Sequence, residues 1–278
     1  MADGNPRRAR RGGMRILVYG DTQTLGRDAA RRVAAILNDA VAARGMAHVV
    51  FATGVSQYEF LDALLAMDVP WQQVTAFHLD EYIGLPAEHP ASFRRYLRER
   101  IFDRVPFAAT HVLDGDAADP AAEAARYEAL LKDVTVDVAC LGIGENGHLA
   151  FNDPPADFES PHLVNVVTLD RVCRMQQVGE GHFASLGDVP QCALSLSIPA
   201  ILSAKAISCI ALDRRKANIF FRYAQIFGAA AMSFMHGAQD GQKFIGVLFL
   251  GLAFCNGQTS VSGVVIPVWL MLLCSTVM

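Results

Sequence analysis

The chain has 278 residues, with 28 acidic and 24 basic side chains and a formal net charge of -4. This length suits one large α/β domain or two small ones, and the acidic balance excludes nucleic-acid binding driven by bulk positive charge. The six cysteines are scattered, without a Cys-x-x-Cys pair or zinc-ligand spacing. Since the N-terminus also lacks the apolar run of a secretory signal, we expect free thiols and a cytoplasmic protein.

The two ends of the chain differ in composition from the segment between them. Residues 1–13 (MADGNPRRARRGG) are basic and rich in glycine, which predicts a disordered arm. Residues 244–278 contain no charged side chain and no histidine. Three interpretations of this apolar stretch are open: a membrane anchor, buried strands of the same domain, or a sequence not selected for this fold, such as a frame change or gene fusion.

Strand-like and helix-like segments alternate between these ends. Short apolar runs predict strands over residues 15–19, 48–52, 74–79, 136–141, 163–169 and 206–212. Helical periodicity is found over 24–44, where Gly45 is the expected stop, and over 58–67, 92–102, 120–132 and 198–204. The alternation predicts a parallel sheet with helices on both faces. Ligands bind beyond the carboxyl ends of the strands in such sheets, and polar segments follow four of these strands.

The first polar segment, residues 53–57 (TGVSQ), opens a helix directly after a strand. Its backbone N–H groups and the hydroxyls of Thr53 and Ser56 could cradle a phosphate at the helix N-terminus. An ordinary turn with a serine cap is the alternative.

The second polar segment places two adjacent carboxylates, Asp80 and Glu81, after the strand ending at residue 79. Because neighbouring side chains point in different directions, one carboxylate can face a ligand while the other caps a helix or pairs with an arginine. A partly desolvated Asp80 would have a raised pKa and could act as a base. A solvated turn is the alternative.

The most distinctive segment is residues 142–155 (GIGENGHLAFNDPP), which follows another predicted strand. Its glycines let the backbone approach a ligand closely, and histidine is well suited to proton transfer near neutral pH. We interpret His148 and Asp153 as an imidazole oriented by a carboxylate, the alternative being a structural histidine. The fourth segment carries three basic side chains that could bind an anion or form a solvated run of charges: Arg214, Arg215 and Lys216.

A family resemblance emerges from these segments together. The chain carries, in this order, ATGVSQ, FHLDEYIGL, SFRRYL, LGIGENGHLAFNDPP, CRMQQVGEGHF and DVPQCALSLSIP. Over roughly residues 15–217 it resembles the glucosamine-6-phosphate deaminases. The resemblance implies a doubly wound, Rossmann-like, mostly parallel sheet with an atypical C-terminal part. It also implies hydrolytic deamination of glucosamine 6-phosphate to fructose 6-phosphate and ammonia, without a metal or an organic cofactor.

The resemblance further implies roles for individual residues. His148 would pass a proton to the ring oxygen and open the pyranose, Asp153 would orient and polarise His148, and Asp80 would move a proton between C2 and C1. Sugar-phosphate binding falls to Thr53, Gly54, Ser56, Gly147 and Lys216. A mobile lid is expected in CRMQQVGEGHF, with Arg174, Glu180 and His182.

This sequence departs from the family in two places. Some members have an aspartate at the position of Asn146, and an amide there reduces a catalytic triad to His148 and Asp153. The closing segments of the family are not found after residue 217. We therefore expect an arm (residues 1–13), a sugar-phosphate isomerase/deaminase domain (14–217) and a divergent hydrophobic tail (218–278), and favour a fused or frame-altered terminus.

Two other functions remain open. One is a 6-phosphogluconolactonase-like hydrolase, and the other is a non-catalytic sugar-phosphate binder or membrane-attached remnant, with residues 244–278 as the anchor. In either case the expected partner is a small sugar phosphate and not nucleic acid, with oligomer formation left open.

Overall fold

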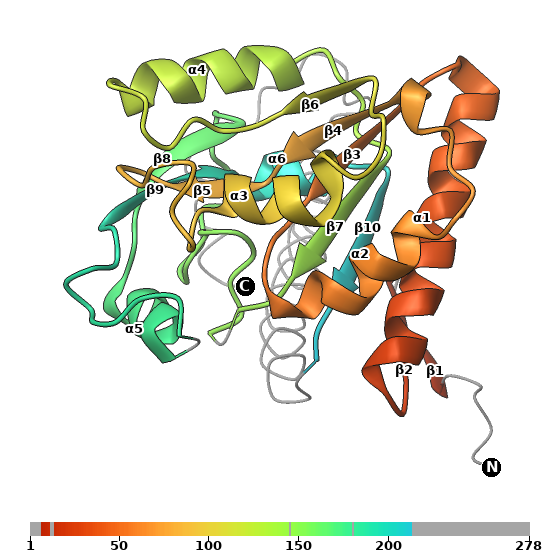
Figure 1. Ribbon diagram of the computed structural model, residues 1–278, viewed down its shortest axis with the longest axis horizontal. Coiled ribbons are helices and arrows are strands. Elements are labelled where there is room, and N and C mark those ends of the chain that lie inside the picture. Colours follow the sequence, from red (N-terminus) through yellow and green to blue (C-terminus); the bar gives the residue numbers. More distant parts are fainter. Residues whose placement is uncertain (1–6, 12–13, 145, 180, 213–278) are drawn as a thin grey trace, which may run out of the picture. The chain divides into compact units, whose positions relative to one another are not determined.

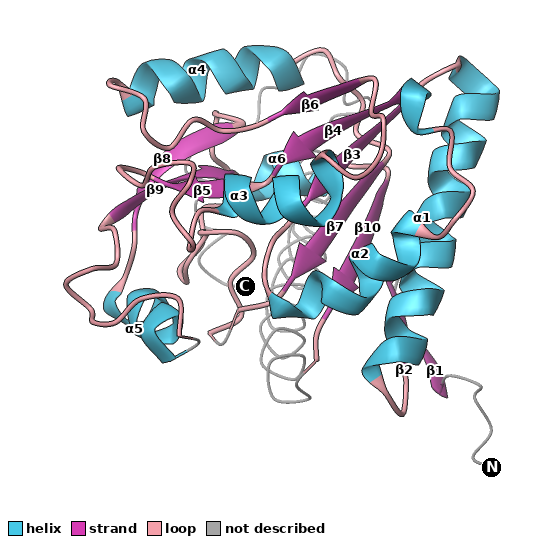
Figure 2. Ribbon diagram, viewed as in Figure 1, coloured by secondary structure: helices cyan, strands magenta, loops and turns pink. Residues whose placement is uncertain are grey.

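The computed structural model describes residues 7–11, 14–144, 146–179 and 181–212, and its central feature is a five-stranded sheet (Figure 1). All neighbouring strands in this sheet are parallel, in the order β10-β7-β3-β4-β6 (Figure 2). Their bounds are β3 Ala47–Phe51, β4 Val74–His78, β6 Ala109–His111, β7 Val138–Gly142 and β10 Ala206–Ile210. The chain builds outward from β3 on one side and then crosses back to β7 on the other. The expected doubly wound sheet is thereby confirmed, and its direction reverses between β3 and β7, where such folds bind ligands.

Helices cover both faces of this sheet, as the alternating pattern predicted. On one face, β3 residues Val49 and Phe51 pack in a core with helices α1 (Thr22–Arg44) and α2 (Tyr58–Leu65). On the other face, Val50 packs with helices α4 (Pro120–Leu131) and α6 (Ile198–Leu202). The predicted stop of the first helix is confirmed: Gly45 has φ 77° and closes α1 by donating its N–H to the carbonyl of Val41.

A second, antiparallel sheet extends the molecule beyond β4. Strands β5 (Asp80–Tyr82), β9 (Cys192–Leu196) and β8 (Val164–Thr168) form it in that order. Helix α5 (Arg171–Gly179) packs beside it in a third apolar cluster, which includes Tyr82 and Phe151. Of these elements the sequence predicted only β8, because β5 is three polar or aromatic residues long and carries no apolar alternation.

The remaining helical segments are short. Helix α3 (Phe93–Leu97) begins at the cap residue Ser92 and continues as a π-helical turn, η3 (Arg98–Phe102), so the predicted helix over 92–102 is present with a change of winding. Single 3-10 turns lie at η1 (Val55–Gln57) and η2 (Trp71–Gln73). None of the helices in the described part of the chain combines the length and apolar character needed to cross a membrane.

The N-terminal arm differs from its prediction. Arg7–Arg11 form strand β1, which pairs antiparallel with β2 (Met14–Val18) in place of a disordered segment. Strand β2 lies outside the parallel sheet, so its backbone N–H and C=O groups need other partners. Strand β1 supplies them. The rest of the arm and the hydrophobic tail at 218–278 lie outside the described residues.

Candidate active site

The carboxyl ends of β3 and β7 lie side by side and carry two of the predicted site segments. Ala52 N–H donates to the carbonyl of Cys140 at 2.9 Å, which continues the pairing to the end of β3. Beyond it, the side-chain amide of Gln57 donates to Leu141 O at 3.2 Å and to Ser56 Oγ at 3.0 Å. The expected phosphate loop at 53–57 therefore packs directly against the start of the glycine-rich segment at 142.

Each segment carries a glycine that suits its geometry, Gly54 through its backbone conformation and Gly142 through a close contact. Gly54 has φ 106°, a conformation that side chains rarely adopt. A Cβ atom on Gly142 would lie 3.0 Å from Ser56 Oγ, so only glycine leaves the hydroxyl in its place. The backbone here is shaped for close approach, as a phosphate site requires.

An aromatic stack holds the phosphate loop from outside. Tyr96 donates its hydroxyl to Gly54 O at 2.9 Å, and its ring stacks on Tyr58 with centroids 5.8 Å apart. The guanidinium of Arg100 lies 4.0 Å from the centroid of the Tyr58 ring. Tyr96 lies in the SFRRYL segment of the resemblance, but no local pattern in the sequence indicates its contact with this loop.

His148, Asn146 and Asp153 form a compact polar group after β7. Nδ1 of His148 lies 2.6 Å from Asn146 Oδ1 and 3.1 Å from Asp153 Oδ1, and Asn146 Nδ2 donates to Asp153 Oδ1 at 3.0 Å. The side chains of His148 and Asp153 are only 11% and 12% exposed. Because Nδ1 faces two oxygen acceptors, it must carry a proton, which leaves Nε2 as the nitrogen that exchanges protons.

The surrounding backbone sets the position of the imidazole. Gly147 has φ 89°, and Gly144 N–H donates to His148 O at 3.0 Å. A Cβ atom on Gly144 would lie 2.1 Å from Nε2 of His148, so the ring occupies the space that any larger residue would fill. The glycines of this segment therefore make room for the histidine as well as for a ligand.

The ionisation of Asp153 reflects its partners. Burial raises its pKa, but hydrogen bonds from His148 and Asn146 together with the attraction of the imidazole outweigh burial and hold the pKa below its usual value. Its second oxygen, Oδ2, is buried and has no hydrogen-bond partner among the described residues. Asp153 is thus an anion that accepts from the imidazole through one oxygen only.

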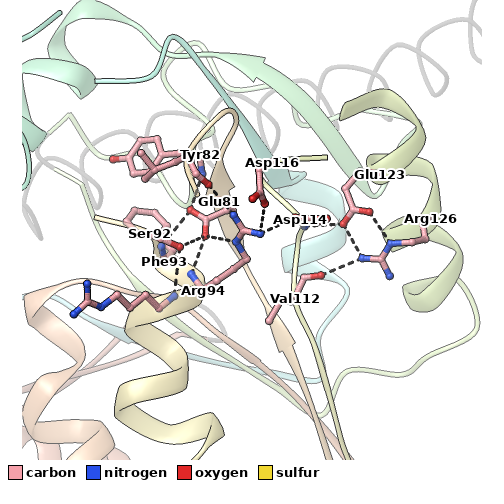
Figure 3. Close-up of polar contacts among 12 residues, drawn as sticks. Glu81, Tyr82, Ser92, Phe93, Arg94, Val112, Asp114, Asp116, Glu123 and Arg126 are labelled. Atoms are coloured by element: carbon pink, nitrogen blue, oxygen red, sulfur yellow. Dashed lines mark hydrogen bonds and ion pairs between the residues drawn. The ribbon is translucent and has the colours of Figure 1, made fainter. Parts of the chain in front are cut away.

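The second of the adjacent carboxylates, Glu81, caps a helix and pairs with an arginine, one of the arrangements expected from the sequence. Glu81 is fully buried and accepts hydrogen bonds from the N–H groups of Phe93 and Arg94 and from Ser92 Oγ at 2.8–3.2 Å, which caps helix α3 (Figure 3). Its Oε2 also lies 3.3 Å from Nε of Arg94. Glu81 is therefore a structural anchor for the strand that carries Asp80.

The Glu81 anchor extends into a larger ionic cluster. Arg94 Nη1 binds both Asp114 and Asp116 at 2.6 Å, and the N–H of Asp114 donates to Glu123 Oε1 at 2.7 Å (Figure 3). The side chain of Arg94 is only 5% exposed, so the pair with Glu81 lies inside the protein. This cluster connects β5, α3 and α4 at the end of strand β5.

Asp80 is buried and electrostatically perturbed. Its residue is 6% exposed, and burial, with the nearby charge of Glu81, raises its pKa to about 8. A carboxylate in this range can act as a base near neutral pH. The alternative of a solvated turn is thereby excluded.

Strand pairing connects Asp80 to the histidine loop. Asp80 lies opposite Ser195 in the β5–β9 ladder. Ser195 Oγ in turn accepts hydrogen bonds from Phe151 N–H at 3.2 Å and Asn152 Nδ2 at 3.4 Å. The charges of Asp80 and Asp153 both act on the buried thiol of Cys173, raising its pKa together with burial, the largest cause. The acidic and imidazole groups thus converge on one region.

The predicted lid residues have separate positions. Arg174 lies in α5 and donates through Nη2 to Leu186 O at 2.7 Å and Val189 O at 2.9 Å, which ties the following segment back to the helix. His182 N–H donates to Gln177 O at 3.0 Å. Glu180 and the basic residues at 214–216, including Lys216, lie outside the described residues.

Most of the chain matches a known protein family. The model of the family described as glucosamine-6-phosphate isomerases/6-phosphogluconolactonase matches residues 20–232. A glucosamine-6-phosphate deaminase from an Exiguobacterium species is 43% identical over 145 residues, which are 52% of this chain and 56% of that protein. The matched segment thus spans little more than half of that relative. The corresponding enzyme from Lysinibacillus sphaericus is 38% identical over 171 residues, covering 62% of this chain and 76% of that protein.

Two solved structures share the fold. A monomeric glucosamine-6-phosphate deaminase of the NagB superfamily superposes with a TM-score of 0.62 at 32% identity, covering 68% of this chain and 78% of that one. A 6-phosphogluconolactonase from Shewanella baltica gives a TM-score of 0.61 at 22% identity, covering 73% and 83%. At the lower identity the likeness concerns the fold alone.

Proposed function

The chain belongs to the glucosamine-6-phosphate isomerase/6-phosphogluconolactonase family, and from this premise we propose that it catalyses the hydrolytic deamination of glucosamine 6-phosphate. One equivalent of water is consumed, and fructose 6-phosphate and ammonia are released. The observation that supports the proposal is the link through Ser195 between the strand of buried Asp80 and the segment that follows His148, next to the loop at 53–57. We also propose a cytoplasmic role in amino-sugar catabolism.

His148 opens the sugar ring in this mechanism. Its Nδ1 is committed to Asn146 and Asp153, so Nε2 delivers a proton to the ring oxygen as the C1–O bond to that oxygen breaks, and takes up the proton that the C1 hydroxyl loses as the aldehyde forms. Asp153 remains ionised and stabilises the imidazolium form during the transfer. Asn146 holds both partners, because its amide donates to Asp153 and its carbonyl oxygen accepts from His148.

Asp80 acts on the opened chain. As a carboxylate it removes the proton from C2 and returns a proton to C1, which converts the amino aldose into a C2 imine through an enediol-like state. Water then adds at C2, and the resulting carbinolamine expels ammonia to leave the ketone of fructose 6-phosphate. Burial makes Asp80 a stronger base than a solvated aspartate, since its raised pKa lies close to working pH.

The phosphate end of the substrate is assigned to the loop after β3. Thr53, Gly54 and Ser56 offer backbone N–H groups and hydroxyls at the start of a helical segment, where a phosphate is favoured. Gly147 from the facing segment leaves room for the sugar. Lys216, outside the described residues, is proposed as the cationic partner of the phosphate.

Ammonia release from the purified full-length chain, coupled to detection of fructose 6-phosphate, tests the proposal. Turnover of glucosamine 6-phosphate is expected, and Asp80→Asn should reduce kcat by about 10²–10⁴-fold, the usual contribution of a positioned general base. The exposed Asp103→Asn is a matched control with unchanged turnover. Unchanged activity in Asp80→Asn would remove Asp80 as the base.

Two further assays on the same purified chain distinguish the two other candidate functions. Hydrolysis of 6-phosphogluconolactone without ammonia release from the amino sugar would indicate the lactonase, whose fold this chain shares. Thermal stabilisation by glucosamine 6-phosphate without turnover would indicate a sugar-phosphate-binding protein. Ammonia production in the absence of lactone hydrolysis supports the deaminase over both.

A further inference from the structure

Three side chains of different chemistry meet at the proposed ring-opening group, where Cys173 adjoins His148 and Asp153. The ligand atoms of His148, Asp153 and Cys173 all lie within 4.8 Å of one another. They come from two separate segments, the loop after β7 and helix α5. We propose that these three residues form a binding site for a thiophilic divalent cation such as Zn²⁺, and that the bound cation inhibits the enzyme.

The donor set suits zinc and its close relatives. Imidazole nitrogen, carboxylate oxygen and cysteine sulfur are the protein ligands that Zn²⁺ prefers, and three of them leave a fourth position for water or substrate. Bonds of about 2.0–2.3 Å place the donors of a tetrahedral site roughly 3–4 Å apart. His148 Nδ1 and Asp153 Oδ1 lie 3.1 Å apart, which is within this donor spacing, and the whole group lies within 4.8 Å.

The burial of these three side chains and a carboxylate oxygen left unpartnered by the described residues both favour a bound cation. Cys173 is 1% exposed, and the side chains of His148 and Asp153 are close to nine-tenths buried, so a bound ion would be shielded from water. Asp153 Oδ2 is buried without a hydrogen-bond partner among the described residues. A carboxylate oxygen in that state is costly unless it gains a partner, and a divalent cation supplies one.

Binding of the cation would stop the proposed reaction. A cation bound through Nδ1 of His148 would replace the contacts of that nitrogen with Asn146 and Asp153, which orient the imidazole. A cation bound through Nε2 would occupy the nitrogen that delivers the proton in the proposed reaction, so either mode would block ring opening. Asp153 would neutralise the metal and no longer stabilise a charged imidazole. This inhibitory effect rests on the proposed function, whereas cation binding itself does not.

The first test measures binding without reference to catalysis. The metal-free full-length protein is titrated with Co²⁺, whose bond to a thiolate gives a charge-transfer absorption band, and Zn²⁺ is then used to displace it. We expect the band in the original protein, its loss in Cys173→Ser and Cys173→Ala, and a Zn²⁺ affinity reduced by at least about tenfold in both variants. Cys192→Ser, which alters a cysteine of strand β9 outside this group, should keep the band and the affinity.

The cysteine variants make the outcome unambiguous. The chain contains six cysteines, so zinc binding alone would not identify the site. Circular dichroism establishes that each variant is folded, and two replacements at position 173 guard against a folding defect of either one. Equal Zn²⁺ affinity in the folded Cys173 variants and the original protein would overturn the proposal.

The second test measures ammonia release in the presence of Zn²⁺. Inhibition should occur in the original protein and in Cys192→Ser, be reversed by a chelator, and be weakened by at least about tenfold in Cys173→Ser. Cys173-dependent Co²⁺ binding in a protein without deaminase activity would defeat the proposed function and leave the cation site standing. Deaminase activity without such binding would do the reverse.

Discussion

The hydroxyl of Tyr96 donates a hydrogen bond to the backbone carbonyl of Gly54 at 2.9 Å. This contact joins helix α3 to the loop proposed to hold the substrate phosphate. Because Tyr96 binds a backbone carbonyl of the loop, it can position the loop without contacting the sugar itself. Its removal is expected to change substrate binding more than the chemical step.

Tyr96→Phe keeps the ring stacked on Tyr58 and deletes only the hydroxyl. We expect KM for glucosamine 6-phosphate to rise roughly 2- to 10-fold, with kcat nearly unchanged, because a lost hydrogen bond costs about 0.5–1.5 kcal/mol. Steady-state ammonia release measures both constants. Tyr58→Phe is the matched control, since it preserves the ring stack and the Gly54 contact; a fall in kcat with constant KM in Tyr96→Phe would contradict the positioning role.

Asp80 should determine the pH dependence of catalysis. Its pKa is raised to about 8 by burial and by Glu81, so the base is protonated below that pH and becomes competent above it. We expect kcat/KM to increase with pH through a limb centred near 8, measured as ammonia release in constant-ionic-strength buffers. A flat profile of kcat/KM from about pH 6 to about pH 9 would show that another group removes the proton from C2.

The same shift predicts a pH dependence of stability. In the unfolded chain the pKa of Asp80 is about 3.9, whereas in the folded protein it is about 8. The folded state binds the extra proton between these values, so the contribution of Asp80 to stability falls as pH rises across this window. Denaturant unfolding should show this loss in the original protein and not in Asp80→Asn; parallel pH profiles for the two would rule out the shift.

Gly144 is expected to be essential for activity and dispensable for folding. In Gly144→Ala the new Cβ would lie 2.1 Å from Nε2 of His148, so the imidazole must move. Displacement of a catalytic group by about 1 Å commonly costs about 100-fold in rate, and we expect a loss in kcat of that order. Gly20→Ala, where a Cβ meets nothing within 4 Å, should retain activity; equal activity of both variants would contradict the crowded geometry.

Neighbouring arginines at 94 and 95 should differ sharply in their effect on stability. Arg94 is 5% exposed and faces the fully buried Glu81, so Arg94→Met leaves a buried carboxylate without its cation and should cost about 3–5 kcal/mol. Arg95 pairs with Glu99 at the surface, and Arg95→Met should cost less than about 1 kcal/mol. Urea unfolding measures both, and similar losses would show that the Arg94 cluster is not a buried anchor.

Local patterns predicted most of the parallel sheet and its helices. The long apolar face of α1 and its stop at Gly45 follow directly from residue order, and both are present in the structure. The antiparallel sheet was missed because β5 and β9 are stabilised by pairing with each other across more than a hundred residues. The pairing of β1 with β2 also overrides the polar composition of the arm.

The site was predictable where its parts lie in one segment. His148 and Asp153 are five positions apart in a glycine-rich turn, and the sequence alone indicated that they would meet. The sequence also indicated that one of the adjacent carboxylates could cap a helix or pair with an arginine, and Glu81 does both. Cys173 and Tyr96 carry no such local signal, because helix packing brings each of them to the loops. The roles assigned to these residues stay predictions.

Ser195 couples two parts of the protein that the reaction needs at the same time. Its main chain faces Asp80 across the ladder, and its hydroxyl fastens the turn that follows His148. Thermal unfolding of strand β9 would therefore displace Asp80 and loosen the turn after His148 at the same time. Heat inactivation should then be cooperative, without a partly active state that opens the sugar ring but does not transfer the proton from C2 to C1.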